Sequence, residues 1–175
     1  MNFTFEVDLM DKRSIANAVK ELRQYKNDFR VRLDKFARKL AELGVQEAQI
    51  HIRAWDAIDD GTLINSIGVN VGKSYGSKVK YYVVANCDYA CFVEFGTGSV
   101  GANAPYPFPF PKGVKWKYGV GKKIFTTKDG RRGWVYMDKD GDFWFTEGME
   151  ARPFMAQASL ALFDQVERVA KEVFG

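Results

Sequence analysis

Apolar residues recur at alternating steps of four and three between positions 15 and 43, and this repeat constrains the fold of the 175-residue chain most strongly. The positions in register are Ile15, Val19, Leu22, Phe29, Leu33, Phe36, Leu40 and Leu43, with Lys26 in the one remaining place. Because a helix repeats about every 3.6 residues, these positions form one apolar stripe. We expect a helix over residues 11–54, about 65 Å long. The stripe resembles a coiled-coil seam, but we favour a helix laid across a sheet or a neighbouring subunit.

Segments rich in β-branched and aromatic residues follow the long helix. The expected strands are residues 66–71, 78–85, 134–138 and 143–146. The first two are joined by a Gly/Ser-rich turn, and the last two form a hairpin around Lys139-Asp140-Gly141. Residues 2–7 alternate apolar and polar side chains, which predicts a short strand or an extended arm. Residues 88–95 suit either a helical turn or a strand.

A second helix with the same spacing closes the chain. The residues at these steps are Met155, Ser159, Leu162, Val166, Val169 and Val173. Pro153 suits the first turn, where a missing N–H costs no hydrogen bond. We therefore expect one α+β domain over residues 1–175, with a long N-terminal helix and a C-terminal helix packed on an antiparallel sheet of about four strands, and a long inserted loop or hairpin.

The insertion, residues 99–132, is too long for an ordinary connection. Residues 104–111 alternate proline with other residues, so the backbone should be extended, with Tyr106, Phe108 and Phe110 free to anchor on a neighbour. Between residues 112 and 133 there are eight bases and one acid, which leaves a net charge of −3 for the rest of the chain. The bases are Lys112, Lys115, Lys117, Lys122, Lys123, Lys128, Arg131 and Arg132. We expect this loop to be poorly ordered in the isolated protein and to contact a protein or DNA phosphates after assembly.

Residues suited to catalysis or metal binding are few. His51 is the only histidine, so a catalytic triad or a histidine-rich metal site would depend on it. Cys87 and Cys91 are too few for a zinc site, and we expect reduced thiols. The acidic turn at residues 138–142 lacks the glycine and glutamate positions of a calcium loop. We expect no enzymatic activity, no metal, no cofactor and no membrane partner.

Three segments together resemble a known family. They are residues 60–67 (DGTLINSI), residues 89–98 (YACFVEFGTG) and residues 146–155 (TEGMEARPFM). Their order is similar to the minor tail-component family of long-tailed bacteriophages and prophages, whose members are called neck, head–tail joining or tail-completion proteins. The resemblance runs from about residue 11 to the C-terminus and is weakest in the inserted loop.

The resemblance implies a structural virion protein that lies in the host cytoplasm before assembly and then in the neck or tail. It would form a ring, of six copies, that joins the head-closure complex to the tail. The implied partners are further copies of the chain, head-closure or connector proteins, tail-terminator or tail-tube proteins, and non-specifically bound channel DNA. The alternatives are a tail-terminator ring that caps the tail tube, and a small DNA-binding or DNA-cleaving protein.

The family segments supply the candidate site residues, for which we favour fold maintenance over direct partner contact. These residues are Gly61, Thr62, Leu63, Ser66, Glu94, Phe95, Gly96, Thr97, Gly98, Arg152, Pro153 and Phe154. Glycines at these places give backbone freedom at turns. We expect Phe154 to anchor the core and Arg152 to pair with a carboxylate such as that of Glu94.

Overall fold

The first helix, α1 (Lys12–Ala54), dominates the structure. A computed structural model describes residues 4, 6–73, 78–119 and 123–175. The Asp11 side chain caps α1 by accepting a hydrogen bond of 2.9 Å from the backbone N–H of Arg13. The helix expected over residues 11–54 is thus confirmed. Part of the expected N-terminal arm, residues 2, 3 and 5, lies outside the described residues, and its described residues form no strand.

The remaining elements alternate short helices and strands before a second long helix. They are α2 (Thr62–Ser66), β1 (Ile67–Val71), β2 (Tyr81–Ala85), α3 (Ala90–Phe95), α4 (Gly98–Asn103), β3 (Phe125–Thr126), β4 (Arg132–Met137), β5 (Phe143–Thr146), β6 (Gly148–Met149) and α5 (Phe154–Phe174). The α+β class is confirmed, and the segment that left helix and strand open is the helix α3.

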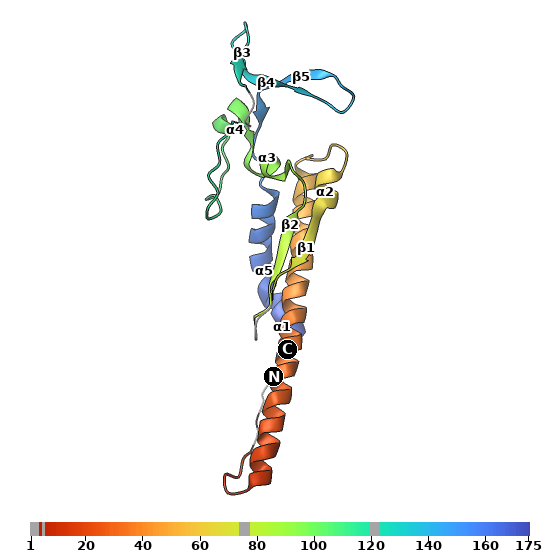
Figure 1. Cartoon of the computed structure of the whole chain (residues 1–175), viewed down its shortest axis with the longest axis vertical. Coiled ribbons are helices and arrows are strands. Elements are labelled where there is room, and N and C mark those ends of the chain that lie inside the picture. Colours follow the sequence, from red (N-terminus) through yellow and green to blue (C-terminus); the bar gives the residue numbers. More distant parts are fainter. Residues whose placement is uncertain (1–3, 5, 74–77, 120–122) are drawn as a thin grey trace.

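The strands divide between two antiparallel sheets, instead of forming one sheet of about four strands. β1 pairs with β2, and β3, β4 and β5 form a separate sheet in that order. The two sheets lie at different places on an elongated molecule (Figure 1). The β1–β2 hairpin lies along α1, while α3, α4 and the long loop carry the chain away before β3 begins.

The core lies where α2, α3 and α5 meet the C-terminal half of α1. The buried cluster consists of Ala48, Ile52, Leu63, Ile64, Ile67, Ala90, Val93, Phe154 and Ala158. Phe154, at the start of α5, is only 1% exposed. α5 then runs antiparallel beside α1 towards the middle of that helix (Figure 1). This packing buries the C-terminal half of α1 and leaves its N-terminal half outside the core.

Gly44 permits the closest packing on α1. A Cβ atom there would lie 2.9 Å from a Val83 methyl carbon of β2 and 3.1 Å from a Leu162 methyl carbon of α5. The helix continues through Gly44, so this glycine is a site of close approach and not the end of a helix. Any larger residue would push β2 or α5 away from α1.

The apolar stripe of α1 is covered over only half of its length. Leu33, Phe36, Leu40 and Leu43 are partly buried. Ile15, Val19, Leu22 and Phe29 are instead 39–43% exposed, and every residue from 19 to 31 is exposed. An isolated helical segment of this length is marginally stable in water, because packing supplies most helix stability in proteins. The N-terminal half of α1 therefore presents an uncovered apolar face.

Candidate interaction surfaces

The second and third family segments lie against each other. Thr97 pairs with Met149, and Gly98 pairs with Gly148, in two antiparallel bridges. Gly98 and Gly148 have φ angles of +66° and +99°. A Cβ on Gly98 would collide with the backbone carbonyl of Glu147, and a Cβ on Gly148 would collide with that of Thr97. Both positions thus require glycine, because of their conformation and because two backbones cross there.

A buried carboxylate joins the same two segments. Glu94 is 6% exposed, and its two oxygens accept hydrogen bonds from the backbone N–H groups of Met155 (2.9 Å) and Ala156 (3.1 Å). The Tyr106 hydroxyl donates a third hydrogen bond, 3.3 Å long. The first N–H groups of a helix have no partner within that helix and favour negative charge. Glu94 of α3 therefore caps α5 from a distant part of the chain.

The expected ion pair between Arg152 and Glu94 is wrong. The Arg152 guanidinium donates to the backbone carbonyl of Asp56 at 3.3 Å, and its backbone N–H donates to the carbonyl of Val93 at 2.8 Å. Both Glu94 oxygens already accept hydrogen bonds from backbone N–H groups at the start of α5. Arg152 instead ties the segment before α5 to the end of α1 and to α3.

The surroundings of Glu94 change the ionisation of both partners. Burial raises the pKa of Glu94 above its ordinary value, although the N–H groups of Met155 and Ala156 act in the opposite direction. Burial and the neighbouring Glu94 carboxylate raise the pKa of Tyr106 to about 12. Tyr106 therefore keeps its proton and donates it to Glu94 in a hydrogen bond.

The proline-aromatic half of the inserted loop packs on its own domain. Tyr106 is 8% exposed, with its ring 4.9 Å from the Phe95 ring and 5.2 Å from the Phe110 ring. The Trp116 indole N–H donates to the Gly96 carbonyl at 3.0 Å. Phe108 is half-buried and contacts Tyr106, with ring centroids 5.6 Å apart. Tyr106 thus covers Glu94 within its own subunit, which corrects the expectation that this side chain is free to anchor on a neighbour.

The basic half of the loop is more exposed. Its exposed bases are Lys112, Lys115, Lys117, Lys123, Lys128, Arg131 and Arg132, and Lys122 lies outside the described residues. Arg131 forms an ion pair of 2.8 Å with Asp129, and its guanidinium lies 5.1 Å from the centre of the Phe145 ring. The other exposed bases of this half form no ion pair among the described residues.

The hairpin of β4 and β5, at one end of the molecule, was expected from the sequence, but its exposed apolar side chains were not. On one face of β4–β5, Met137 pairs with Phe143, and these side chains are 62% and 74% exposed. On the other face, Tyr136 pairs with Trp144, and both are also exposed. The alternation along two paired strands places apolar side chains on both faces, so a single covering layer could not bury them all. This pattern is a signal that sequence reasoning could have used.

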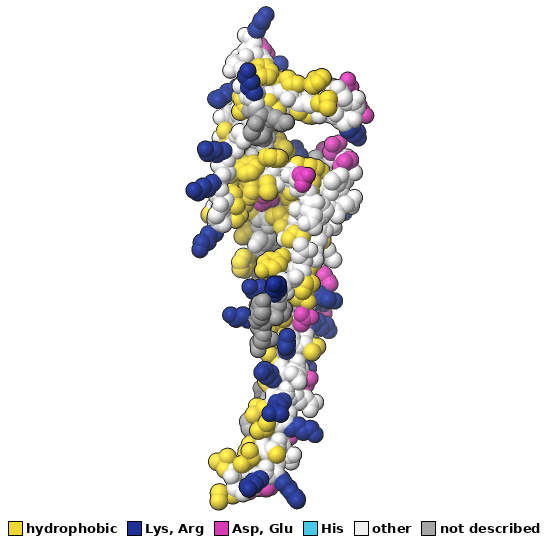
Figure 2. Space-filling model, in the orientation of Figure 1, with side chains coloured by type: hydrophobic (Ala, Val, Ile, Leu, Met, Phe, Trp, Pro, Cys, Tyr) yellow, Lys and Arg dark blue, Asp and Glu magenta, His cyan; other side chains and the backbone are white. Residues whose placement is uncertain are grey.

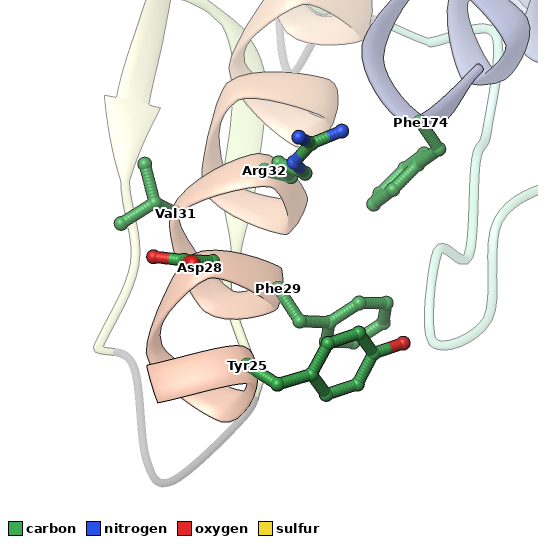
Figure 3. A pocket seen from close by; sticks show the side chains of 6 residues that line it. All are labelled: Tyr25, Asp28, Phe29, Val31, Arg32 and Phe174. Carbon is green, nitrogen blue, oxygen red and sulfur yellow. The ribbon is translucent and has the colours of Figure 1, made fainter. Parts of the chain in front are cut away.

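At the other end, the apolar stripe of α1 opens where α5 stops. The Phe174 ring lies 5.8 Å from the Phe29 ring and 5.7 Å from the Phe36 ring, and Arg32 donates to the Val173 carbonyl at 3.3 Å. Beyond these contacts lies a pocket lined by Tyr25, Asp28, Phe29, Val31, Arg32 and Phe174 (Figure 3). This pocket is the first part of the stripe that α5 leaves uncovered.

The comparison with known families gives one match. Residues 16–96 match the model of the HK97-gp10-like family, described as "Bacteriophage HK97-gp10, putative tail-component". This segment, slightly less than half of the chain, is similar to that bacteriophage tail-component family. The resemblance expected from the sequence is thereby confirmed, although the matched range includes only the first marked segment and residues 89–96 of the second. No curated protein and no solved structure gives a significant match to the chain.

Few other features of the described residues suggest a function. Among the described residues, no group of three or more His, Cys, Asp or Glu side chains could hold a metal ion. Cys87 and Cys91 are free thiols. Within the described ranges, no helix is both long enough and apolar enough to cross a membrane. The surfaces most in need of explanation are therefore the two uncovered apolar ends.

Proposed function

We propose that this tail component is a non-enzymatic structural subunit, which forms a ring at the head–tail neck and joins the head-closure complex to the tail. The observation that carries the proposal is an elongated subunit with an uncovered apolar surface at each end (Figure 2). Exposed apolar patches of this kind mark protein–protein contacts. A joining protein needs two such contacts, one towards each structure that it connects.

The two ends differ in chemistry, which suits two different partners. The α1 end presents a helical stripe that includes Val19 and Leu22, and basic side chains flank it. The hairpin end presents the aromatic side chains of Phe143 and Trp144 beside an acidic turn. The proposed partners are a head-closure or connector protein at one end, and a tail-terminator or tail-tube protein at the other.

The proposed ring follows from the symmetry expected at the head–tail neck. Soluble homo-oligomers are mostly closed and symmetric, and a ring forms when unlike faces of neighbouring copies meet with a rotation that closes. Six copies would match a six-fold tail. The location that follows is the neck of the virion, after assembly from subunits in the host cytoplasm.

A tail-terminator ring is the second candidate, because it needs the same combination of self-association and apolar end surfaces. Loss of the gene product separates the two. Without a neck protein, filled heads and complete tails of normal length accumulate unjoined, and adding the purified protein joins them. Without a terminator, the tail tube has no cap and grows beyond its normal length.

Electron microscopy of lysates from phage that cannot express the chain tests the proposal. Unjoined heads and normal tails support the neck role. Over-long tails assign the terminator role instead, and normal infectious particles contradict both. Empty heads with normally joined tails would point to a role in DNA processing, for which a purified-protein nuclease assay is the direct check.

A further inference from the structure

The N-terminal half of α1 carries a second concentration of positive charge, as large as that of the inserted loop. Residues 12–39 contain ten lysines and arginines and three acids. The sum over the whole chain hides this excess, because the acids lie elsewhere. Basic side chains follow the protruding part of α1 in the space-filling view (Figure 2).

The charges are sorted around the helix. At about 100° per residue, Arg23 and Arg30 fall on the same side as Asp34, with Lys20 and Lys26 on either flank. Asp34 marks that side in the structure, because it accepts a hydrogen bond of 2.8 Å from the Tyr81 hydroxyl at the start of β2. Glu21 and Asp28 fall roughly 140° and 120° away from Asp34 around the helix.

The β1–β2 hairpin extends the same basic side. Lys80 precedes Tyr81, and its backbone carbonyl accepts a hydrogen bond of 2.8 Å from the Gly72 N–H across the hairpin. Lys73, Lys78 and Lys80 therefore lie at the end of the hairpin that faces the free half of α1 (Figure 1), and all three are exposed. We define the basic face as Lys20, Arg23, Lys26, Arg30, Lys73, Lys78 and Lys80.

Charges on this face are not neutralised within the subunit. In the described part of the chain, Lys20, Arg23, Lys26 and Arg30 have no ion-pair partner, and all four are exposed. Their Cα atoms span about 15 Å along the helix axis at 1.5 Å per residue. That length corresponds to roughly four base pairs of duplex DNA at 3.4 Å per pair.

We propose that the basic face binds the phosphate backbone of duplex DNA without reading its base sequence. Exposed lysines favour this partner over an acidic protein, because protein–protein interfaces are depleted in lysine whereas phosphate contacts depend on lysine and arginine. The apolar stripe borders this face of α1, with Lys26 at the boundary between them, and the apolar side chains of the stripe stay available for a protein. The biological source of the duplex, DNA in the channel of the neck, rests on the proposed function.

The test compares two variants that each lose four positive charges. K20Q/R23Q/K26Q/R30Q changes the basic face, and K112Q/K115Q/K117Q/K123Q changes the inserted loop. Fluorescence anisotropy with a labelled duplex of mixed sequence measures the affinity of the full-length protein over a range of salt concentrations. Circular dichroism checks that both variants keep the wild-type helix content.

We expect wild-type affinity to fall steeply with salt, since each phosphate contact contributes about 0.9 to the slope of log K against log salt. The basic-face variant should bind about tenfold or more weakly, with a slope smaller by up to about 3.6, while the loop variant stays near wild type. Equal losses in both variants, or a loss in the loop variant alone, overturn the assignment to α1. Binding of poly-glutamate as tightly as the duplex overturns DNA in favour of an acidic protein.

The outcome of this binding test can be distinguished from the outcome for the proposed function. Duplex binding is measured on the purified protein and does not depend on where the chain lies in the particle. If the protein is absent from the neck but only the basic-face variant loses duplex binding, the proposed function fails and this inference stands. If the protein lies in the neck and its duplex binding is unchanged in the basic-face variant, this inference alone fails.

Discussion

The carboxylate of Glu94 accepts a hydrogen bond of 2.9 Å from the backbone N–H of Met155, 61 residues further along the chain. It links the end of the family-matched segment to the start of the last helix. One side chain thereby joins the matched part of the chain to the part outside the match.

Replacing Glu94 with alanine should destabilise the fold by about 2–3 kcal/mol, since the N–H groups of Met155 and Ala156 lose their acceptor. E94Q keeps one amide oxygen and should lower the free energy of unfolding by about 1 kcal/mol. Y106F removes one hydrogen-bond donor and should lower it by a similar amount. Urea unfolding followed by circular dichroism measures the three values. Equal stabilities of wild type and E94A would show that Glu94 does not cap α5.

The stability difference between wild type and E94Q should depend on pH. Burial raises the folded-state pKa of Glu94 above its ordinary value of 4.5, so between the two values the folded protein holds a proton that the unfolded chain releases. The contribution is fully present below about 4.5 and is lost as the pH rises through the folded-state pKa. Carboxylates with lowered pKa, such as those of Asp138 and Glu172, give the free energy of unfolding the opposite pH dependence. They are present in both proteins and cancel in the difference. Unfolding curves at several pH values give the difference, and a difference that grows with pH would contradict the sign.

Alanine at Gly98 or Gly148 should destabilise the protein by about 2 kcal/mol or more, because each adds a Cβ where φ is positive and a carbonyl lies in the way. G68A is the matched control, since a Cβ on Gly68 in β1 meets no atom within 4 Å. We expect G68A to change the unfolding free energy by about 1 kcal/mol at most. Thermal unfolding ranks the three variants, and equal effects at all three positions would exclude the backbone crossing as the cause.

Replacing Leu22, on the free half of α1, should barely change the stability of the isolated subunit but should impair assembly. Leu22→Ala removes a side chain that is 43% exposed, so the free energy of unfolding should change by about 0.5 kcal/mol or less. Ile52→Ala, at a fully buried position of the same helix, should cost about 2–5 kcal/mol. Denaturant unfolding checks both values, and the yield of joined particles tests the assembly effect. A large loss of stability in L22A would show that this half of α1 is already packed.

The two long helices could be predicted from the sequence because the steps of four and three specify a helical face without any knowledge of its partner. The same spacing could not say what covers that face. Leu43 and Leu22 occupy equivalent positions in the repeat, yet Leu43 is partly buried and Leu22 is exposed. What differs is the length of α5, which ends at Phe174 beside Phe29 and Phe36.

The role of Glu94 could not be predicted in the same way. Its partners in α5 are backbone N–H groups, which every residue except proline has, so the bond leaves no residue-type signature at positions 155 and 156. An arginine nearby in a family segment suggested an ion pair that the structure does not form. Tyr106 illustrates the same limit, because an aromatic residue between prolines in an extended segment suits the domain's own core as well as a partner.

A density map of the intact phage particle, with this chain placed in it, tests the proposed neck role. We expect a closed ring of identical subunits between the head-closure complex and the tail, with α1 and the β4–β5 hairpin each in contact with another protein. Density for the chain at the far tip of the tail, or no density for it in the particle, would exclude the neck role.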